Sequence, residues 1–295
     1  MRGGRTAFFT GDGRLGNQMF QAAFLDHVLS DGDTVICRGM EDFLEGFDWP
    51  RFRVSNTPDR EETRLAKRLL RSLGQTLVSL RLVDGYEHRR QVFTVETGSF
   101  RLRGPEITLS HGLLDKYMYV GKGYFQSAQL AADASFRLKS KHRNPASDFL
   151  ARLPEGPKAF IHVRRGDYRH WRIFDRSPLL HLDYFQQGKR KIESAAPGTQ
   201  FIVLSDEPEA VTDMLSEPDT HLFTGQNVYE DFGLMTLCDG GVVSNSTLSW
   251  WGGFFSNRSL PVIAPQGWLG FTVGIEYPVG IVAPWMTPIE AHAQP

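Results

Sequence analysis

One apolar run that ends in a group of charges constrains the chain more than any other stretch. Residues 158–163 read Lys-Ala-Phe-Ile-His-Val, and Arg-Arg-Gly-Asp-Tyr follows at once. An apolar run of this length, bounded by proline and by polar residues, is typical of a buried strand. His162 lies in this strand, and Arg164, Arg165 and Asp167 follow at its carboxyl end. In open α/β sheets that is the end where ligands bind.

The adjacent arginines, Arg164 and Arg165, indicate an anion. A buried guanidinium without a counter-charge costs several kcal/mol. The planar arginine fork matches phosphate oxygens two at a time, so a diphosphate suits the pair. A charged loop that faces water is the alternative, and the spacing alone leaves the two equally open.

A second stretch, Ser244–Ser249, has the composition of an anion site. It reads Ser-Asn-Ser-Thr-Leu-Ser between the predicted strand 241–244 and a predicted helix. Hydroxyls and unpaired backbone N–H groups at a helix N-terminus bind anions, although the same residues also serve as a simple helix cap. Because this strand and the one at 158–163 belong to one predicted sheet, the two stretches together predict a shared phosphate site.

The second half of the chain alternates strands with helices, which predicts a doubly wound parallel sheet. The further strands are expected at 200–204, 221–223 and 260–264, and the helices at 184–195, 208–215 and 229–238. A polar segment at 139–149, broken by Pro145, separates this half from the first. The sequence is therefore divided into domains 1–145 and 146–295, and the C-terminal tail is a candidate to return to the first domain.

The first half opens with a strand at 6–10, a Gly-x-Gly-x-x-Gly loop at 11–16, a helix at 19–29 and a strand at 34–37. This order is typical of dinucleotide-binding units, so an NAD(P)-dependent oxidoreductase is one alternative. A tight turn without a nicotinamide is favoured, because Asp12 inside the loop would repel a pyrophosphate.

Residues 64–82 show the clearest amphipathic pattern. Leucines occupy one side and basic residues the other: Leu65, Leu69, Leu73, Leu77 and Leu80 against Arg64, Lys67, Arg68 and Arg71. A helix whose leucines pack on the sheet is favoured, and a basic helix on a membrane surface is the alternative. Residues 91–102 alternate as a strand or hairpin would.

Composition excludes several classes. A net charge of -1 argues against a general nucleic-acid binder. Cys37 and Cys238 lie far apart without metal or disulfide spacing, which favours a reducing compartment. No apolar run approaches the ~20 residues of a spanning helix. We expect a cytoplasmic protein, at most peripheral on the inner membrane face, with the oligomeric state left open.

The ordered motifs give a specific resemblance. The chain resembles the α-1,2-fucosyltransferases of glycosyltransferase family 11. The matching segments are Gly13–Gln21, Gly123–Ser127, His162–Tyr168, Phe201–Glu207, Asp231–Met235, Ser244–Gly253 and Val262–Pro265 with Trp268. Leu248 and Gly253 stand where Phe and Ala are usual, and the Arg169–Leu180 segment departs from the pattern, which leaves the choice of acceptor open.

The resemblance implies a GT-B type fold, with two Rossmann-like domains facing across a cleft and GDP-fucose on the second. It implies a phosphate contact at Arg164 and a cleft position for Asn17. The remaining implied donor contacts are His162 and Asp231 for the guanosine and Ser246 and Thr247 for the diphosphate. Arg165, Asp206 and Asn245 are further donor-site candidates from their places at strand ends.

The implied reaction moves L-fucose with inversion to a hydroxyl, the 2-OH, of a galactoside in a surface polysaccharide or oligosaccharide. Asp12, Asp167 and Asp175 are candidates for the general base, and an ion pair of Asp167 with an arginine is favoured over that role. We expect no metal and no cofactor besides the donor, since Asp31-Gly-Asp33 reads as a turn. A sugar-binding protein without catalysis is the third alternative.

Overall fold

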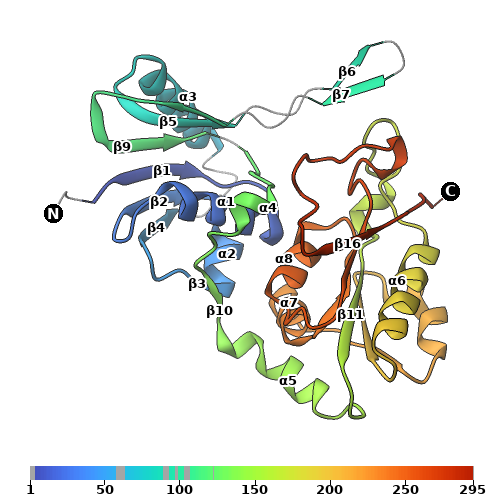
Figure 1. Ribbon diagram of the computed structural model, residues 1–295. Helices are drawn as coiled ribbons and strands as arrows, with labels where there is room; N and C mark the ends of the chain where they lie inside the picture. The colour runs from blue at the N-terminus through green and yellow to red at the C-terminus, as the bar shows by residue number, and fades with distance from the viewer. Residues whose placement is uncertain are drawn as a thin grey trace. The chain divides into compact units, whose positions relative to one another are not determined.

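The computed structural model describes residues 4–57, 64–88, 93–96, 99–102, 107–121 and 123–294, with only the backbone at 64–67, 87–88, 93–96 and 99–102. The chain forms two compact units, Met1–Arg137 and Leu138–Pro295 (Figure 1). The sequence was divided after residue 145 instead. The polar segment 139–149 is part of the second unit, where it forms a 3-10 turn, Ser140–His142, and most of helix α5, Asn144–Leu150.

The first unit is built on a six-stranded sheet in the order β4-β2-β1-β9-β5-β8. The strands are β1 (Thr6–Thr10), β2 (Thr34–Arg38), β4 (Arg53–Thr57), β5 (Val83–His88), β8 (Ile107–Ser110) and β9 (Leu114–Val120). Neighbours run parallel except β8, which is antiparallel to β5. The strands predicted at 6–10 and 34–37 are confirmed. The hairpin expected near 91–102 is present as β6 (Phe93–Glu96) and β7 (Ser99–Leu102).

One face of this sheet is buried under short and long helices. They are α1 (Leu15–Val28), α2 (Glu41–Gly46) and α4 (Ala128–Ala131), and the short strands β3 (Phe47–Asp48) and β10 (Arg137–Leu138) follow α2 and α4. Ala7, Phe9, Val35 and Met118 point to this face and are buried. Helix α1 begins four residues before the predicted Met19, so the end of the glycine motif is helical rather than loop.

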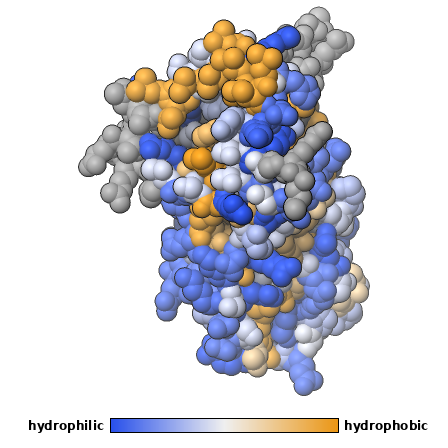
Figure 2. Space-filling model, turned by 90° about the vertical axis from the view of Figure 1, so that its left-hand side faces the viewer, coloured by the Kyte–Doolittle hydropathy of each residue, from blue (hydrophilic) through white to orange (hydrophobic). Residues whose placement is uncertain are grey.

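The other face carries α3 (Arg64–Ser79), which packs on the sheet as predicted, but not through the side that was expected. Of the leucines expected to pack inward, Leu69, Leu73 and Leu80 are exposed, and Figure 2 shows apolar side chains gathered at the level of α3. The helix contacts the sheet through Gly74, where a Cβ would lie 2.3 Å from the Tyr119 ring. The absent side chain lets the ring approach, so Leu69 and Leu73 point outward while Leu77 packs against Tyr119 and its neighbours. The side chains of residues 64–67 lie outside the described part.

The second unit holds a six-stranded sheet with all neighbours parallel, as predicted. Its order is β13 (Thr220–Leu222), β12 (Gln200–Ser205), β11 (Lys158–Val163), β14 (Gly240–Val242), β15 (Val262–Pro265) and β16 (Met286–Ile289). Strand β11 has the bounds read from the sequence, and β16 was not predicted. Both units are thus Rossmann-like, and the fold is of the GT-B type.

Helices cover both faces of this second sheet. Helix α6 (Leu182–Ala195) lies on one side of β11, and α7 (Val228–Leu237) and α8 (Thr247–Phe255) lie on the other (Figure 1). The segment predicted as a helix at 208–215 is 3-10, Pro208–Ser216, and shorter 3-10 turns occur at Gly166–Arg169 and Phe271–Val273. Trp250 and Trp251 are fully buried, so they belong to the core, as expected.

Candidate functional site

The topology of the second unit selects one edge of its sheet. From β11 the chain adds β12 and then β13 on one side, and then crosses to add β14, β15 and β16 on the other. The connections therefore diverge above the carboxyl ends of β11 and β14. In a doubly wound sheet this switch point is where ligands bind. The two stretches singled out from the sequence, after Val163 and after Val242, meet there.

The arginines after β11 are paired with carboxylates. Arg164 places Nη2 2.6 Å from Asp167 Oδ1 and Nη1 2.9 Å from Asp206 Oδ2. Arg165 places Nε 3.2 Å from Glu207 Oε2, an atom that also accepts from Arg169. The anions expected beside the two arginines are therefore carboxylates of the protein itself. The expected ion pair of Asp167 with an arginine is present.

This arginine cluster consists of Arg164, Arg165, Arg169, Asp167, Asp206 and Glu207, whose formal charges cancel. Gly166 is required in it, because a Cβ there would lie 2.5 Å from Asp206 Oδ2. Of the two arginines that directly follow β11, Arg164 is the more open, with 20% of its side chain exposed against 10% for Arg165. Arg164 can therefore exchange a carboxylate for another anion, whereas Arg165 is held in place.

His162 links the two strands at the switch point. Its Nδ1 lies 2.9 Å from the hydroxyl oxygen of Ser244, beyond β14. Burial, reinforced by the charge of Arg164, lowers the pKa of His162 to about 3. The ring is therefore neutral at physiological pH, and it serves as a hydrogen-bonding group rather than a charge.

Helix α8 points its N-terminus at the same edge. Ser246 is its N-cap residue but makes no side-chain cap hydrogen bond, and Ser246 and Thr247 are half-buried. The first N–H groups of a helix have no partner inside the helix, which suits an anion. Asn245 differs, because it is buried and its Nδ2 donates to Pro178 O at 2.8 Å. Asn245 thus anchors the Arg169–Leu180 segment.

Asp231 lies in the first turn of α7, after β13. Its Oδ1 accepts from the Gly225 N–H at 2.9 Å, while Asn227 caps the helix. Burial raises the pKa of Asp231 above its ordinary value. β13 is two strands from β11, a span of about 10 Å at ordinary strand spacing. Asp231 and Arg164 thus stand at separate points of one edge.

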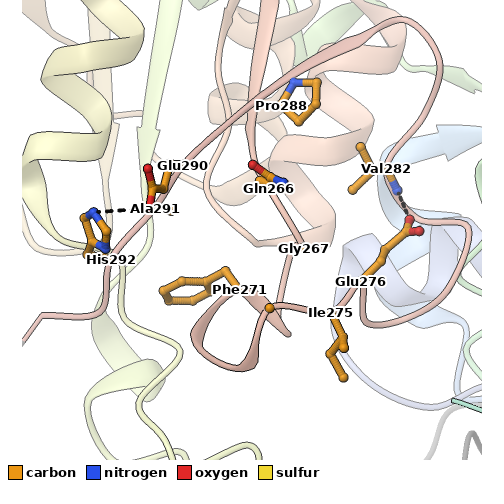
Figure 3. A pocket seen from close by; sticks show the side chains of 11 residues that line it. Gln266, Gly267, Phe271, Ile275, Glu276, Val282, Pro288, Glu290, Ala291 and His292 are labelled. Carbon is orange, nitrogen blue, oxygen red and sulfur yellow. Dashed lines mark hydrogen bonds and ion pairs between the residues drawn. The ribbon is translucent and has the colours of Figure 1, made fainter. Parts of the chain in front are cut away.

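A cavity of about 490 Å³ opens at the carboxyl ends of β15 and β16, farther along the same edge. Its polar lining includes Gln266, Glu276, Glu290 and His292, and Phe271 forms part of the wall (Figure 3). Glu276 is held by the Val282 N–H at 2.8 Å. Carboxylates, amides and an imidazole accept hydrogen bonds from sugar hydroxyls. None of these residues was singled out from the sequence, because β16 was not predicted.

The C-terminal residues complete the second unit. After β16, Gln294 Oε1 accepts from Arg165 Nη1 at 2.8 Å, and the Gln294 N–H donates to Leu179 O. The tail is thus hydrogen-bonded within its own unit. Gln294 and Glu207 are site residues that sequence reasoning missed. Glu207 carried a signal, since it follows Asp206 directly, whereas Gln294 carried none.

The first unit has a switch point of its own, between β1 and β9. Asn17 on α1 accepts at Oδ1 from Gln126 Nε2 at 2.8 Å, which joins α1 to the loop after β9. Gln21 Nε2 likewise donates to Gly123 O at 2.9 Å. Asp12 accepts from the next N–H, that of Gly13, at 3.0 Å. Side-chain amides thus hold the segments of this edge together.

The remaining candidates lie elsewhere. Asp175 is exposed in a turn that joins Ile173 and Arg176. Asp33 is buried and accepts the N–H groups of Arg5 and Ser30, and Asp31 lies 2.5 Å from Arg51 Nε. Asp31 and Asp33 thus hold a turn before β2. Among the described residues, no cluster of acidic, histidine or cysteine side chains is suited to hold a metal ion.

Comparison with known proteins gives the family. A sequence model described as Glycosyl transferase family 11 matches residues 96–270, which include the arginine cluster and the start of α8. The chain belongs to glycosyltransferase family 11. In Escherichia coli, the O-antigen biosynthesis glycosyltransferase WbnK is 28% identical over 116 residues, 37% of this chain and 38% of that protein. An alpha-1,2-colitosyltransferase of the same organism is 30% identical over 115 residues, 37% of this chain and 40% of its own.

One solved structure supports the fold, and another is similar to this chain. A glycosyl transferase family 9 structure from Veillonella parvula has a TM-score of 0.50 and 11% identity, covering 88% of this chain and 80% of its own. A NodZ alpha-1,6-fucosyltransferase soaked with GDP-fucose has a TM-score of 0.47 and 12% identity, covering 86% of this chain and 93% of its own. In the part of the chain that the structure describes, no helix has both the length and the apolarity to cross a membrane.

Proposed function

We propose that this protein is an inverting fucosyltransferase that moves L-fucose from GDP-fucose to the 2-OH of a galactoside. One observation carries the proposal: in a member of family 11, a partly open arginine and an uncapped helix N-terminus share one switch point. A diphosphate needs such cationic and N–H partners. Family membership favours this reaction over a nicotinamide oxidoreductase or a sugar-binding protein without catalysis.

The donor lies, in this proposal, along the carboxyl edge of the second unit. Asp231 accepts hydrogen bonds from the guanine N1–H and exocyclic amine, since one carboxylate takes both. The diphosphate binds the N-terminus of α8 through Ser246, Thr247 and backbone N–H groups. His162 stays neutral and orients the Ser244 hydroxyl beneath them.

Arg164 stabilises the leaving group. The bond between the anomeric carbon and the phosphate oxygen breaks with its electron pair on GDP, while the acceptor oxygen bonds the opposite face of that carbon and gives up its proton. A preorganised donor aimed at the developing charge lowers the barrier. The arginine cluster has no net charge, so Arg164 must leave one carboxylate to meet the phosphate. In this scheme it turns from Asp167 toward the phosphate, while its Nη1 stays paired with Asp206.

The acceptor proton goes to a carboxylate in this scheme. Asp12 lies in the first unit, and Asp167 and Asp175 lie beyond the strand that ends in Arg164. We assign the first unit to the acceptor, a galactose-containing glycan of a surface polysaccharide or oligosaccharide. The reaction requires no metal, and its place is the cytoplasm, at the inner membrane face. The free, buried Cys37 and Cys238 fit a reducing compartment.

A colitosyl donor is a second candidate, favoured by the 30% identity to an alpha-1,2-colitosyltransferase. Colitose is L-fucose without its 3-hydroxyl, so the guanosine and diphosphate contacts are common to both donors. The cavity at the carboxyl ends of β15 and β16 would then discriminate between the two sugars.

The test is a transfer assay in excess EDTA with GDP-fucose and GDP-colitose against a panel of galactosides. The expected product is an α-fucoside at the galactose 2-OH, identified by NMR. Thermal stability in the presence of GDP-fucose, ADP and NADPH gives an independent reading, since a ligand at 100 times its Kd adds ~2.7 kcal/mol. Stabilisation by NADPH with no sugar transfer would refute the proposal.

A further inference from the structure

The sheet of the first unit has a face that its helices leave partly open. Register places Phe8 beside Ile36 on one side and beside Tyr119 on the other, so the three side chains point to the same face. Tyr117 lies one row away on this face, beside Thr6. Helix α3 covers Tyr119, which is buried, but Phe8, Ile36 and Tyr117 are each at least 40% exposed.

Helix α3 adds to the open apolar surface instead of closing it. Leu69, Leu70 and Leu73 are 63%, 53% and 56% exposed, on a helix that contacts the sheet through Gly74 and Val78. Leu80 follows in the turn after the helix, and Leu113 and Leu114 lie at the start of β9. We call this set, together with Phe8, Ile36 and Tyr117, the apolar face.

Six members of the apolar face line one groove. A groove of about 480 Å³ runs between α3 and the sheet, and it is lined by Leu70, Leu73, Leu114, Phe8, Ile36 and Tyr117 among others. Figure 2 shows the apolar side chains gathered at the level of α3, while the rest of that view is mostly hydrophilic. Exposed apolar patches of this extent mark surfaces that are covered in use.

The basic side chains near the apolar face indicate what kind of surface covers it. From Arg64 to Leu82 the chain has five basic residues, Arg64, Lys67, Arg68, Arg71 and Arg81, and no acidic residue. Of those whose side chains are described, Arg68 and Arg81 are exposed. Arg38 lines the groove at the end of β2, and Arg53 is exposed on β4. The apolar face thus has basic side chains along its edge, with the acidic Asp115 among them.

This combination matches an anionic lipid bilayer. Apolar side chains that enter the acyl boundary, together with cationic side chains at the headgroups, are the composition of membrane-surface helices. A second copy of the chain matches it poorly. In a two-fold interface the basic side chains of each copy would meet their own image, and like charges would oppose one another.

We propose that the apolar face of the first unit docks this protein on an anionic membrane surface, with Leu69, Leu70 and Leu73 inserted and Arg68 and Arg81 at the headgroups. The proposal does not depend on the donor or on the reaction, because it concerns binding to lipid alone.

The test is co-sedimentation of the full chain with vesicles of phosphatidylcholine alone and of phosphatidylcholine with 30% phosphatidylglycerol, without glycan or donor. Binding is expected to the anionic vesicles and to weaken as salt is added. Leu69→Gln/Leu73→Gln should lower the partition coefficient at least tenfold. Arg68→Gln/Arg81→Gln should lower it about tenfold on anionic vesicles only, since each basic residue contributes modestly.

The matched control is Arg190→Gln/Lys191→Gln, which removes the same charge from exposed positions of α6 in the second unit. It should leave binding within about twofold of the unaltered protein. Because the leucines are exposed, circular dichroism melts should show that the leucine variant keeps its fold. Equal binding by all variants would overturn the proposal. The proposal would also be overturned if the unaltered protein did not bind vesicles and formed a dimer that the leucine substitutions disrupt.

Discussion

The two switch points of this chain share a topology and differ in chemistry. In each unit a central strand, β1 or β11, lies between one strand series and the next, so the sheet opens a site at its carboxyl edge. In the second unit that edge holds Arg164, with its carboxylates, and the start of α8. In the first it holds Asn17 bonded to Gln126. Topology therefore determines where a ligand can bind, and the side chains determine which ligand.

The polar groups at the two edges suit different ligands. The amides of the first unit, Asn17 and Gln126 among them, are neutral donors and acceptors of the kind that suits hydroxyl groups. The arginine cluster pairs each cation with a carboxylate, and Arg164 and Arg169 are partly open. That difference leads us to assign the donor diphosphate to the second unit and the acceptor to the first.

The largest expected effect comes from Arg164. Arg164→Ala should lower kcat by about 10²–10³, because one preorganised donor to the leaving group is lost. Arg164→Lys should recover little of it, since a point charge lacks the fork. Steady-state kinetics checks both, with Arg152→Gln, an exposed site of the same unit, as the control. A lysine variant with a nearly unchanged rate would contradict the assignment.

The counterpart in the first unit is Asn17. Asn17→Ala should raise the acceptor KM and leave GDP affinity unchanged, because Asn17 belongs to the edge assigned to the acceptor. Calorimetry with GDP and kinetics against the acceptor measure the two effects separately. If Asn17→Ala and Arg164→Ala weakened GDP equally, the division of labour between the units would be wrong.

A smaller effect is expected at Asp231. Asp231→Asn should weaken GDP by about ten- to a hundredfold, as expected for lost hydrogen bonds to a charged group, and leave ADP unchanged. Calorimetry with GDP and ADP measures this preference. An unchanged preference in the variant would exclude the role in guanine recognition.

The pH dependence of the same residue has a definite sign. Burial raises the pKa of Asp231, so the carboxylate that binds guanine is lost at a higher pH than an ordinary aspartate would be. The preference for GDP over ADP should fall as pH falls, and the Asn variant should lack this step. A raised acid pKa stabilises the fold only below it, so at pH 7 the Asn variant should melt no lower than the unaltered protein. A large drop in Tm would show a structural role instead.

Asp167 should matter less. Asp167→Asn is expected to lower kcat about tenfold or less, because Asp206 still holds Arg164, whereas loss of a general base commonly costs 10²–10⁴. The pH–rate profile separates the roles. If Asp167 only positions Arg164, the variant keeps the acid limb of the pH–rate profile. If Asp167 is the general base, the variant loses that limb. Loss of that limb together with a thousandfold rate drop would make Asp167 the base.

No effect on turnover is expected from metal removal. Activity should survive excess EDTA, and Asp31→Asn/Asp33→Asn should keep the rate per folded molecule. Thermal melts should show a cost of about 1–3 kcal/mol, since buried Asp33 accepts two backbone N–H groups. Activity that returns only with Mg²⁺ or Mn²⁺ would reverse this expectation.

Much of the fold follows from local pattern. The apolar run at 158–163 gives β11 its bounds, and the alternation after it predicts a doubly wound sheet, because a buried parallel strand requires an apolar run whatever surrounds it. The edge of the sheet at which ligands bind follows too, because it is the carboxyl edge of the parallel strands. Arg164, His162, Asp206 and Ser246 could therefore be brought to one site from strand ends alone.

What only the tertiary structure decided depends on contacts between distant segments. Periodicity separates the two sides of α3 but does not say which one packs, and the Tyr119 ring against Gly74 turns Leu69 and Leu73 outward. The charges after β11 predicted anions but not that Asp206 and Glu207 supply them. Gln294 reaches Arg165 only because β16 joins the sheet. Local sequence determines the elements, whereas partners far apart in the chain are selected only when the sheet is assembled.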